Sequence, residues 1–244
     1  MPVGLRDYLR PDSLTEAVNL LRQGEGRTAL LAGGTELVGR RDQPVDALVD
    51  LRRLVPETMT THGGTVAIGA MTTLHDLFTK LKGSLLARAA ALAAPATIRA
   101  AATLGGTLAG EKGGLEVPTA LLAMGATVIL ATPTLREVPL GAFLANKAAT
   151  LQGSIITEIR ISTTKPGGLA RVSRTPADRA IIIAAAVVDG PAHRVAVGGL
   201  APYPRLADPA LDRWEAMNDH LGSAEYRRWV APVLVRRALE EAQA

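Results

Sequence analysis

The chain has 244 residues, no cysteine and a formal net charge of +4. This length is enough for one large domain or two modest ones, and the lack of cysteine excludes disulfides, thiolate nucleophiles and cysteine-bound zinc or iron–sulfur clusters. No run approaches the roughly 18 apolar residues of a membrane helix and no apolar signal core begins the chain, so we expect a cytoplasmic protein that does not enter a membrane.

The first part of the chain predicts alternating helices and strands. Ser13 and Glu16 form a capping box at the start of an amphipathic helix. An apolar run at 28–31 predicts a buried strand that ends in a glycine turn at 32–36. The next predicted elements are strands at 47–51 and 65–68 and a helix from Thr73, capped together with Asp76, to Leu81.

The second part begins with an alanine-rich helical pattern from Ser84 to Ala102, which is interrupted at Pro95 and ends in a second glycine turn at 103–110. After it, we expect a helix at 116–124, strands at 127–131 and 155–161, a domain boundary at Lys165-Pro166-Gly167-Gly168, strands at 180–188 and 194–197, and an amphipathic helix from about Tyr226 to Ala242. Helices and strands alternate early and segregate later, which predicts an α/β front followed by an α+β part.

Two glycine pairs, 33–34 and 105–106, each follow an apolar segment and precede a threonine. Without a Cβ atom, glycine lets a phosphate approach the backbone, and several amide groups can then point at one anion. One such turn is more often structural, but two in one chain favour a phosphate site. The usual motifs are absent: no GxGxxG follows the first strand, and Glu111 stands where a Walker A loop has its lysine.

The scattered basic residues and histidines form no recognisable binding motif. The arginine pairs at 40–41, 52–53, 227–228 and 236–237 are dispersed, and three Tyr, two Phe and two Trp leave little for base stacking. Solvated faces and an acidic partner subunit explain the arginines better than nucleic acid does. His62, His75, His193 and His220 match no metal-ligand spacing, so we predict no metal site.

Six ordered segments resemble the FAD-binding medium subunit of the molybdenum hydroxylases, the family of xanthine dehydrogenase and carbon monoxide dehydrogenase. They are LLAGGTELVGR at 30–40, IRAAATLGGTLAG at 98–110, SIITEIRIS at 154–162, RVSRTPADRA at 171–180, VAVGGLAPYPRLA at 195–207 and SAEYRRWVAPVLVRRAL at 223–239. The resemblance covers nearly the whole chain. It implies an α/β and α+β fold, with a two-lobed FAD-binding domain of the PCMH type at 1–165 (lobes of about 1–55 and 56–165) and a smaller C-terminal domain with an antiparallel sheet and helices at 168–244.

The resemblance also implies the cofactor contacts. Carried over by position, the backbone that faces the FAD diphosphate belongs to Ala32, Gly33, Gly34, Thr35 and Glu36 and to Thr103, Leu104, Gly105, Gly106 and Thr107, with Leu104 near the flavin ring. Glu116 stands where the family has an aspartate near the adenosine portion. Ile156 and Arg171 stand where it has a flavin-pocket aliphatic residue and a lysine, although a strand core and a surface charge explain them equally well. No side chain is expected to be catalytic.

The function implied is a relay of electrons. The molybdenum cofactor would lie on a large partner subunit and the iron–sulfur clusters on a small one, and FAD would pass electrons to an external acceptor such as NAD, oxygen or a quinone-linked carrier. A cysteine-free chain is consistent with this division.

The sequence also departs from the family. Thr107 replaces a frequent asparagine, the loop 110–114 contains Glu111, which could repel phosphate, and Lys112, which could attract it, and the segment between Pro204 and Tyr226 is short. Two alternatives therefore stay open: a flavin-free scaffold subunit of the same fold, and a module that binds nucleic acid or an acidic partner through the arginine pairs.

Overall fold

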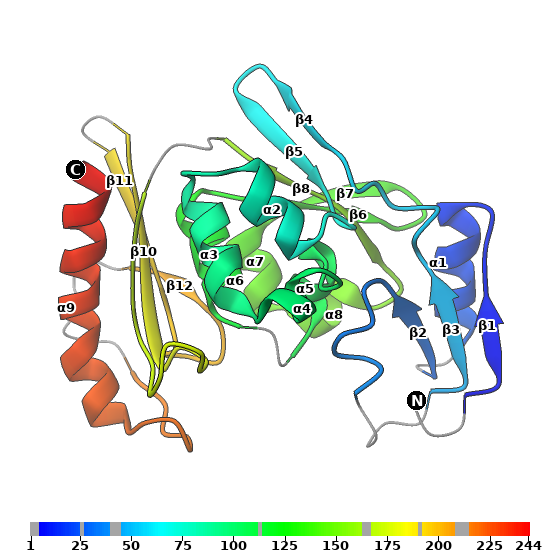
Figure 1. The fold of residues 1–244 in the computed structure, drawn as a ribbon. Helices are drawn as coiled ribbons and strands as arrows, with labels where there is room; N and C mark the ends of the chain where they lie inside the picture. The colour runs from blue at the N-terminus through cyan, green and yellow to red at the C-terminus, as the bar shows by residue number, and fades with distance from the viewer. Residues whose placement is uncertain are drawn as a thin grey trace.

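The fold was analysed in a computed structural model, which describes residues 5–24, 27–39, 45–111, 114–162, 167–189, 192–207 and 215–244. Three sheets follow one another along these residues (Figure 1). The first sheet and the third lie at opposite sides of the molecule, with a group of helices between them. The arginine pair 40–41, Lys112 and the Lys165–Pro166 part of the expected boundary fall outside the described residues.

The first sheet is parallel, with the strand order β1-β3-β2. Its strands are β1 (Asp7–Leu9), β2 (Thr28–Leu31) and β3 (Ala47–Asp50), and helix α1 (Leu14–Gln23) packs against it. The central strand β3 is buried along its whole length, as expected for a parallel strand with neighbours on both sides. The predicted cap of α1 is confirmed, because the Ser13 hydroxyl accepts a 3.1 Å hydrogen bond from the Glu16 N–H.

The second sheet is antiparallel, with the strand order β4-β5-β8-β6-β7. The strands are β4 (Met59–His62), β5 (Thr65–Gly69), β6 (Thr127–Ala131), β7 (Leu135–Pro139) and β8 (Ile155–Ile161). The strand β8 lies at the centre, and its isoleucines are buried in the core that the first two sheets share. The β4–β5 hairpin projects from the body of the molecule (Figure 1).

Several helices lie beside this sheet, and those at 140–145 and 147–151 were not predicted from the sequence. They are α2 (Leu74–Lys80), α3 (Leu85–Ala93), α4 (Ala96–Arg99), α5 (Leu104–Ala109), α6 (Glu116–Ala123), α7 (Leu140–Ala145) and α8 (Lys147–Leu151). The expected break at Pro95 separates α3 from α4. One expectation is wrong: residues 104–109 form helix α5 and not an open turn. The reason is the cap, since the Thr103 hydroxyl accepts from the Gly106 N–H at 3.1 Å.

The third sheet is antiparallel, with the order β12-β11-β10-β9. It consists of β9 (Gly168–Val172), β10 (Ile182–Asp189), β11 (Ala192–Gly198) and β12 (Arg205–Leu206), and helix α9 (Ala224–Gln243) covers its outer face (Figure 1). Because α6 contacts β10 and β11 as well, β10 is covered by helices and remains apolar over most of its length. The expected fold class, an α/β part followed by an antiparallel sheet with a helix, is confirmed. The exact domain bounds stay a prediction.

No helix in the described ranges is long and apolar enough to cross a membrane.

Candidate cofactor-binding cleft

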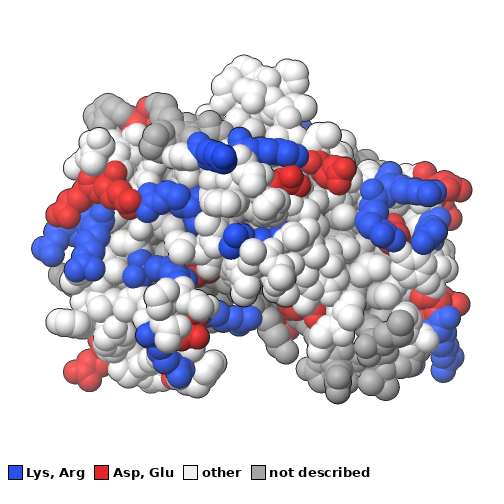
Figure 2. All heavy atoms as spheres, viewed as in Figure 1, with Lys and Arg blue, Asp and Glu red and all other residues white. Residues whose placement is uncertain are grey.

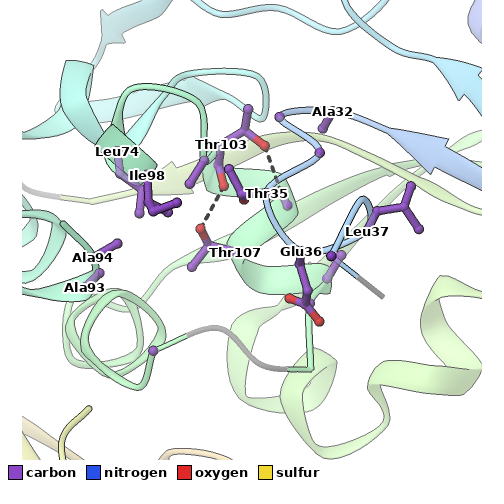
Figure 3. Close-up of a pocket in the computed structure, with 18 of the residues that line it drawn as sticks. Ala32, Thr35, Glu36, Leu37, Leu74, Ala93, Ala94, Ile98, Thr103 and Thr107 are labelled. Carbon is purple, nitrogen blue, oxygen red and sulfur yellow. Dashed lines mark hydrogen bonds between the residues drawn. The ribbon is translucent and has the colours of Figure 1, made fainter. Parts of the chain in front are cut away.

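The two predicted glycine segments line one cleft of about 500 Å³. One wall is the loop after β2, and the other is formed by the end of α3, by α4 and by α5. In Figure 3, Thr35 and Glu36 on the first wall lie across from Thr103 and Thr107 on the second. The cleft therefore separates a segment of the first sheet's lobe from a segment of the second.

Gly33 brings the two walls into direct contact. A Cβ atom at this position would lie 1.8 Å from the carbonyl oxygen of Ala101, so any larger residue would collide with backbone. Gly34, next to it, has φ +67°, a left-handed conformation that favours glycine. Glycine is thus required at the two positions for different reasons. Gly33 allows a close approach of the lobes, and Gly34 allows the chain to turn.

The first wall also presents unused hydrogen-bond donors. The N–H groups of Gly33, Gly34 and Thr35 donate no hydrogen bond to any part of the chain that the structure describes, and all three residues line the cleft. Consecutive N–H groups at a glycine turn form a concave site for an anion. This wall has the donors that a phosphate group needs.

The second wall is different, because its N–H groups already have partners. Leu104 donates to the Thr72 carbonyl at 2.9 Å, Gly105 to the Ala70 carbonyl at 2.8 Å, and Thr107 to the Thr103 carbonyl at 2.8 Å. Gly106 donates to the Thr103 hydroxyl, as described above. The Thr107 hydroxyl also has a partner, since it donates to the Thr103 carbonyl at 2.8 Å. What this wall offers to a ligand is instead the Thr103 hydroxyl and its small residues, which leave the surface open.

An apolar surface continues from the second wall. It consists of Leu74, Ala93, Ala94, Ile98 and Ala102, and the Ile98 side chain is 43% exposed (Figure 3). An exposed isoleucine beside alanines provides an apolar surface against which a ring can pack. The cleft thus combines polar donors with an apolar surface, the usual composition of a site for a cofactor.

One end of the cleft is held by a contact between the lobes. A carboxylate oxygen of Glu36 accepts a 2.9 Å hydrogen bond from the N–H of Glu111, and the Lys147 ammonium donates to the Gly110 carbonyl at 2.6 Å. The loop in which the sequence departs from the family is therefore tied at its start to both lobes. Lys112, the other charge of this loop, lies outside the described residues.

The expected contact residues divide into two groups. Those that line the cleft are Ala32, Gly33, Gly34, Thr35, Glu36, Thr103, Gly106 and Thr107. The others do not line it: Leu104 is fully buried, Gly105 packs on Ala70, Ile156 is in the core strand β8, and Glu116 and Arg171 are joined to each other. Whether each residue contacts the cofactor stays a prediction.

Glu116 and Arg171 form a buried ion pair, with 2.8 Å between Glu116 Oε1 and the Arg171 guanidinium. The resemblance assigns them to different portions of FAD, whereas in the fold they are in contact. The second carboxylate oxygen of Glu116 is buried without a hydrogen-bond partner. It lies 2.4 Å from where a Cβ atom of Gly114 would be, and Gly114 lines the cleft. An unpaired acceptor thus lies directly behind the cleft wall.

Sequence reasoning missed several lining residues. The apolar surface at 93–98 could have been found from Ile98, an apolar residue in the short segment that follows the proline break. Arg179, which reaches the cleft from the connection between β9 and β10, gave no signal beyond its place in the segment RVSRTPADRA. No group of three or more His, Asp or Glu side chains suited to a metal ion occurs among the residues that the structure describes.

Comparison with known proteins identifies this architecture. Residues 3–163 match the family described as the FAD binding domain in molybdopterin dehydrogenase. The chain belongs to this family. It is thus a flavoprotein subunit of the molybdenum hydroxylase type, with FAD as its cofactor.

Relatives of known function are similar over almost their whole length. The carbon monoxide dehydrogenase medium chain of Afipia carboxidovorans is 32% identical over 99% of this chain and 98% of its own, and that of Hydrogenophaga pseudoflava is 30% identical over 98% and 97%. A solved structure of carbon monoxide dehydrogenase from Hydrogenophaga pseudoflava matches with a TM-score of 0.84 at 27% identity, covering 100% of this chain and 98% of that one. The alignment with the Hydrogenophaga medium chain spans 280 positions, so that relative has segments without a counterpart in these 244 residues.

Proposed function

We propose that the chain holds FAD in the cleft between its first two lobes and relays electrons from iron–sulfur clusters on a partner subunit to an external acceptor. The observation that carries the proposal is the convergence of both glycine segments on one cleft, with three unused N–H donors on one wall. Family membership supplies the identity of the cofactor.

Different residues of the cleft are suited to different portions of FAD. The N–H groups of residues 33–35 are suited to the diphosphate oxygens, and the hydroxyls of Thr103 and Thr107 are within the same cleft. The apolar surface around Ile98 is suited to a ring of the cofactor. The unpaired oxygen of Glu116 is suited to accept a hydrogen bond from a cofactor hydroxyl at the wall formed by Gly114.

No side chain of the cleft is proposed to act as acid, base or nucleophile. When bound, FAD supplies the exchange between one-electron and two-electron transfer, and the protein contributes its position and surroundings. We propose a molybdenum-cofactor subunit and an iron–sulfur subunit as partners, because the relatives above are medium chains of carbon monoxide dehydrogenase and this chain lacks cysteine.

The arginine pairs offer weaker support for a nucleic-acid module. Figure 2 shows the Lys and Arg side chains of one face in separate groups, with Asp and Glu among them. A backbone-binding protein needs a continuous basic surface. The face drawn in Figure 2 therefore gives no specific reason to prefer this second function.

The decisive experiment is the visible absorption spectrum of the purified chain, followed by identification of the nucleotide that denaturation releases. We expect a yellow protein with close to one FAD per chain. The variant Gly33→Ala should lose most of its FAD, because the new Cβ atom collides with the Ala101 backbone. Gly39→Ala is the matched control: it changes a cleft-lining glycine whose new Cβ atom meets only an ordinary contact of 3.6 Å.

A colourless wild-type chain that also fails to take up added FAD would support the scaffold alternative. The relay itself is tested in the assembled complex, by following flavin absorbance after the molybdenum subunit is given its reductant. Flavin that stays oxidised while the clusters become reduced would contradict the proposed direction of electron flow.

A further inference from the structure

The second sheet has two edge strands, β4 and β7, and their sequences differ in kind. The strand β7 carries Arg136 and Glu137 and ends at Pro139. Charged side chains and proline at an edge hinder pairing with a further strand. The strand β4 reads Met-Thr-Thr-His, without proline, acidic residue, lysine or arginine, and its register with β5 is regular. Its outer edge is therefore suited to pairing with another strand.

The whole β4–β5 hairpin lacks charged side chains. Residues 58–75 contain no Lys, Arg, Asp or Glu, and the tip of the hairpin is white at the top of Figure 2. Its turn consists of Gly63 and Gly64, whose φ angles of +54° and +79° suit the tight two-residue turn of a regular hairpin. A regular, uncharged edge strand that projects from the protein favours aggregation unless another chain covers it.

The backbone of β4 directs hydrogen-bonding groups outward at two residues. The Gly69 N–H donates to the Thr58 carbonyl at 2.9 Å. In an antiparallel ladder, residues that bond to the partner strand alternate with residues whose N–H and C=O groups point away from it. Thr58 and Thr60 thus bond to β5, whereas the N–H and C=O groups of Met59 and Thr61 point to the outer edge.

A groove of about 770 Å³ lies beside this edge. Met59 and Thr61, the residues with outward backbone groups, both line it. The other apolar lining residues are Val66 of β5 and Leu81, which directly follows α2. A strand that bonds to the edge would therefore have an apolar surface for one of its side chains.

The charges of the groove favour a basic segment. Asp76 and Lys80 of α2 form an ion pair of 3.1 Å, so their charges largely cancel. Glu57, the other charged residue of the lining, is exposed and has no ion-pair partner within the described part of the chain. The hairpin of a second copy carries no cation and would leave Glu57 unmatched. A segment of a different chain that carries Lys or Arg fits the groove better.

We propose that β4 is a docking site at which an extended segment of a partner subunit adds a strand to the second sheet. The segment bonds to the N–H and C=O groups of Met59 and Thr61, places an apolar side chain in the groove and brings a Lys or Arg to Glu57. In such strand addition, main-chain hydrogen bonds provide affinity and the pockets for side chains provide specificity. This inference rests on the proposed assembly with partner subunits and not on the FAD site.

Hydrogen exchange resolved to single amides, in the isolated chain and in its complex with the partner subunits, tests the proposal directly. In the isolated chain, the amides of Met59 and Thr61 should exchange faster than that of Thr60, because only Thr60 bonds to β5. In the complex, exchange at Met59 and Thr61 should slow by roughly tenfold or more. Unchanged exchange at both residues in an intact complex would overturn the inference and leave the proposed function intact.

A matched pair of variants at one residue tests the main-chain bonds. Thr61→Pro removes an outward N–H while the bonds between β4 and β5 remain, and we expect it to raise the Kd for the partner subunits roughly tenfold. Thr61→Ala keeps the N–H and should stay within about twofold of the wild type. Both variants should retain the FAD content of the wild type, since Thr61 is exposed and lies outside the cleft lining. Equal affinities of the two variants would contradict strand addition.

A second pair tests the charge of the segment. Glu57→Gln should raise the Kd for the partner subunits about twofold to threefold and make it less dependent on salt. Glu137→Gln, on the other edge strand, is the control and should match the wild type. An unchanged Kd and salt dependence in Glu57→Gln would contradict a basic segment.

The oligomeric state of the isolated chain distinguishes the remaining occupant. Protection of Met59 and Thr61 that rises with the concentration of the isolated chain, together with a dimer in sedimentation, would identify a second copy as the occupant and overturn the inference. A chain that forms no complex with a molybdenum or an iron–sulfur subunit would overturn both this inference and the proposed partners.

Discussion

At the scale of single residues, Asp50 shows how one carboxylate stabilises the first lobe. Its side chain is 9% exposed, accepts from the Arg52 guanidinium and from the Tyr8 hydroxyl, and lies at the end of the central strand β3. The hydrogen bonds from Arg52, helped by the one from Tyr8, hold the pKa of the Asp50 carboxyl well below its usual range. Burial acts in the opposite direction and is outweighed.

This lowered pKa predicts a pH-dependent contribution to stability. The stabilisation is complete above the unfolded-state pKa of about 4 and is lost as the pH falls toward the folded-state pKa. Asp50→Asn should therefore lower the free energy of unfolding by about 1–2 kcal/mol at neutral pH, and its difference from the wild type should shrink below about pH 4. Urea unfolding across this range measures both effects.

The control for this prediction is Asp46→Asn, which removes an ion pair with Arg27 of 2.8 Å whose side chains are 28% and 56% exposed. Such a surface pair contributes about 0.5 kcal/mol or less. Equal effects of the two substitutions at every pH would contradict the account given for Asp50.

At the scale of elements, most of the helices and strands were predicted from the sequence because their signals are local. The caps of α1 and α2 and the apolar run of β2 needed no information from distant residues. The strands β4 and β7 were missed because most of their residues are exposed, which leaves no alternation of apolar and polar positions. Helix α5 was taken for a turn because its two glycines disfavour a helix, and only its cap and its packing override that preference.

Helix α9 shows that identical neighbours in the sequence can have opposite roles. Arg227 and Arg228 are adjacent, yet the first is 1% exposed and the second is exposed. The Arg227 guanidinium donates to the carbonyls of Ile181, Gly199 and Gly222 and to the carboxylate of Asp219. It thereby joins the start of the helix to the ends of β10 and β11.

We therefore predict that Arg227→Ala lowers the free energy of unfolding by about 3–5 kcal/mol, since it leaves the partly exposed Asp219 carboxylate and several carbonyls without their donor and removes a buried side chain. Arg228→Ala should change it by less than about 0.5 kcal/mol, as is usual for a surface substitution. Chemical denaturation of the two variants gives the comparison. A small effect of Arg227→Ala would mean that water replaces the lost donors.

At the scale of the whole molecule, the sequence predicted the components of the site better than their arrangement. Eight of the expected residues line the cleft because glycine and threonine at the ends of buried segments are recognisable locally. The ion pair between Glu116 and Arg171 joins residues separated by 55 positions, and the place of Arg179 depends on how the third sheet packs against α6. Such contacts depend on tertiary packing, which a single sequence does not specify.

A cleft between lobes predicts that the cofactor stabilises the whole protein. With FAD at 100 times its Kd, binding adds about 2.7 kcal/mol to the free energy of unfolding, which corresponds to a rise in Tm of roughly 5–10 °C for a protein of this size. Calorimetry of the apoprotein with and without FAD tests this, with adenosine, which lacks the diphosphate, as the control ligand. An unchanged Tm at saturating FAD would show that the cofactor does not bind the folded state preferentially.

The order of the cleft's parts along the chain has a consequence for the synthesis of the protein. Its first wall follows β2, its second wall is formed by residues 93–114, and Arg179 lies in the connection between β9 and β10. A ribosome must therefore release the chain beyond this arginine before all three parts can meet. The complete lining of the cleft thus forms late in synthesis, and we expect a nascent chain stalled before Arg179 to bind FAD more weakly than the finished protein.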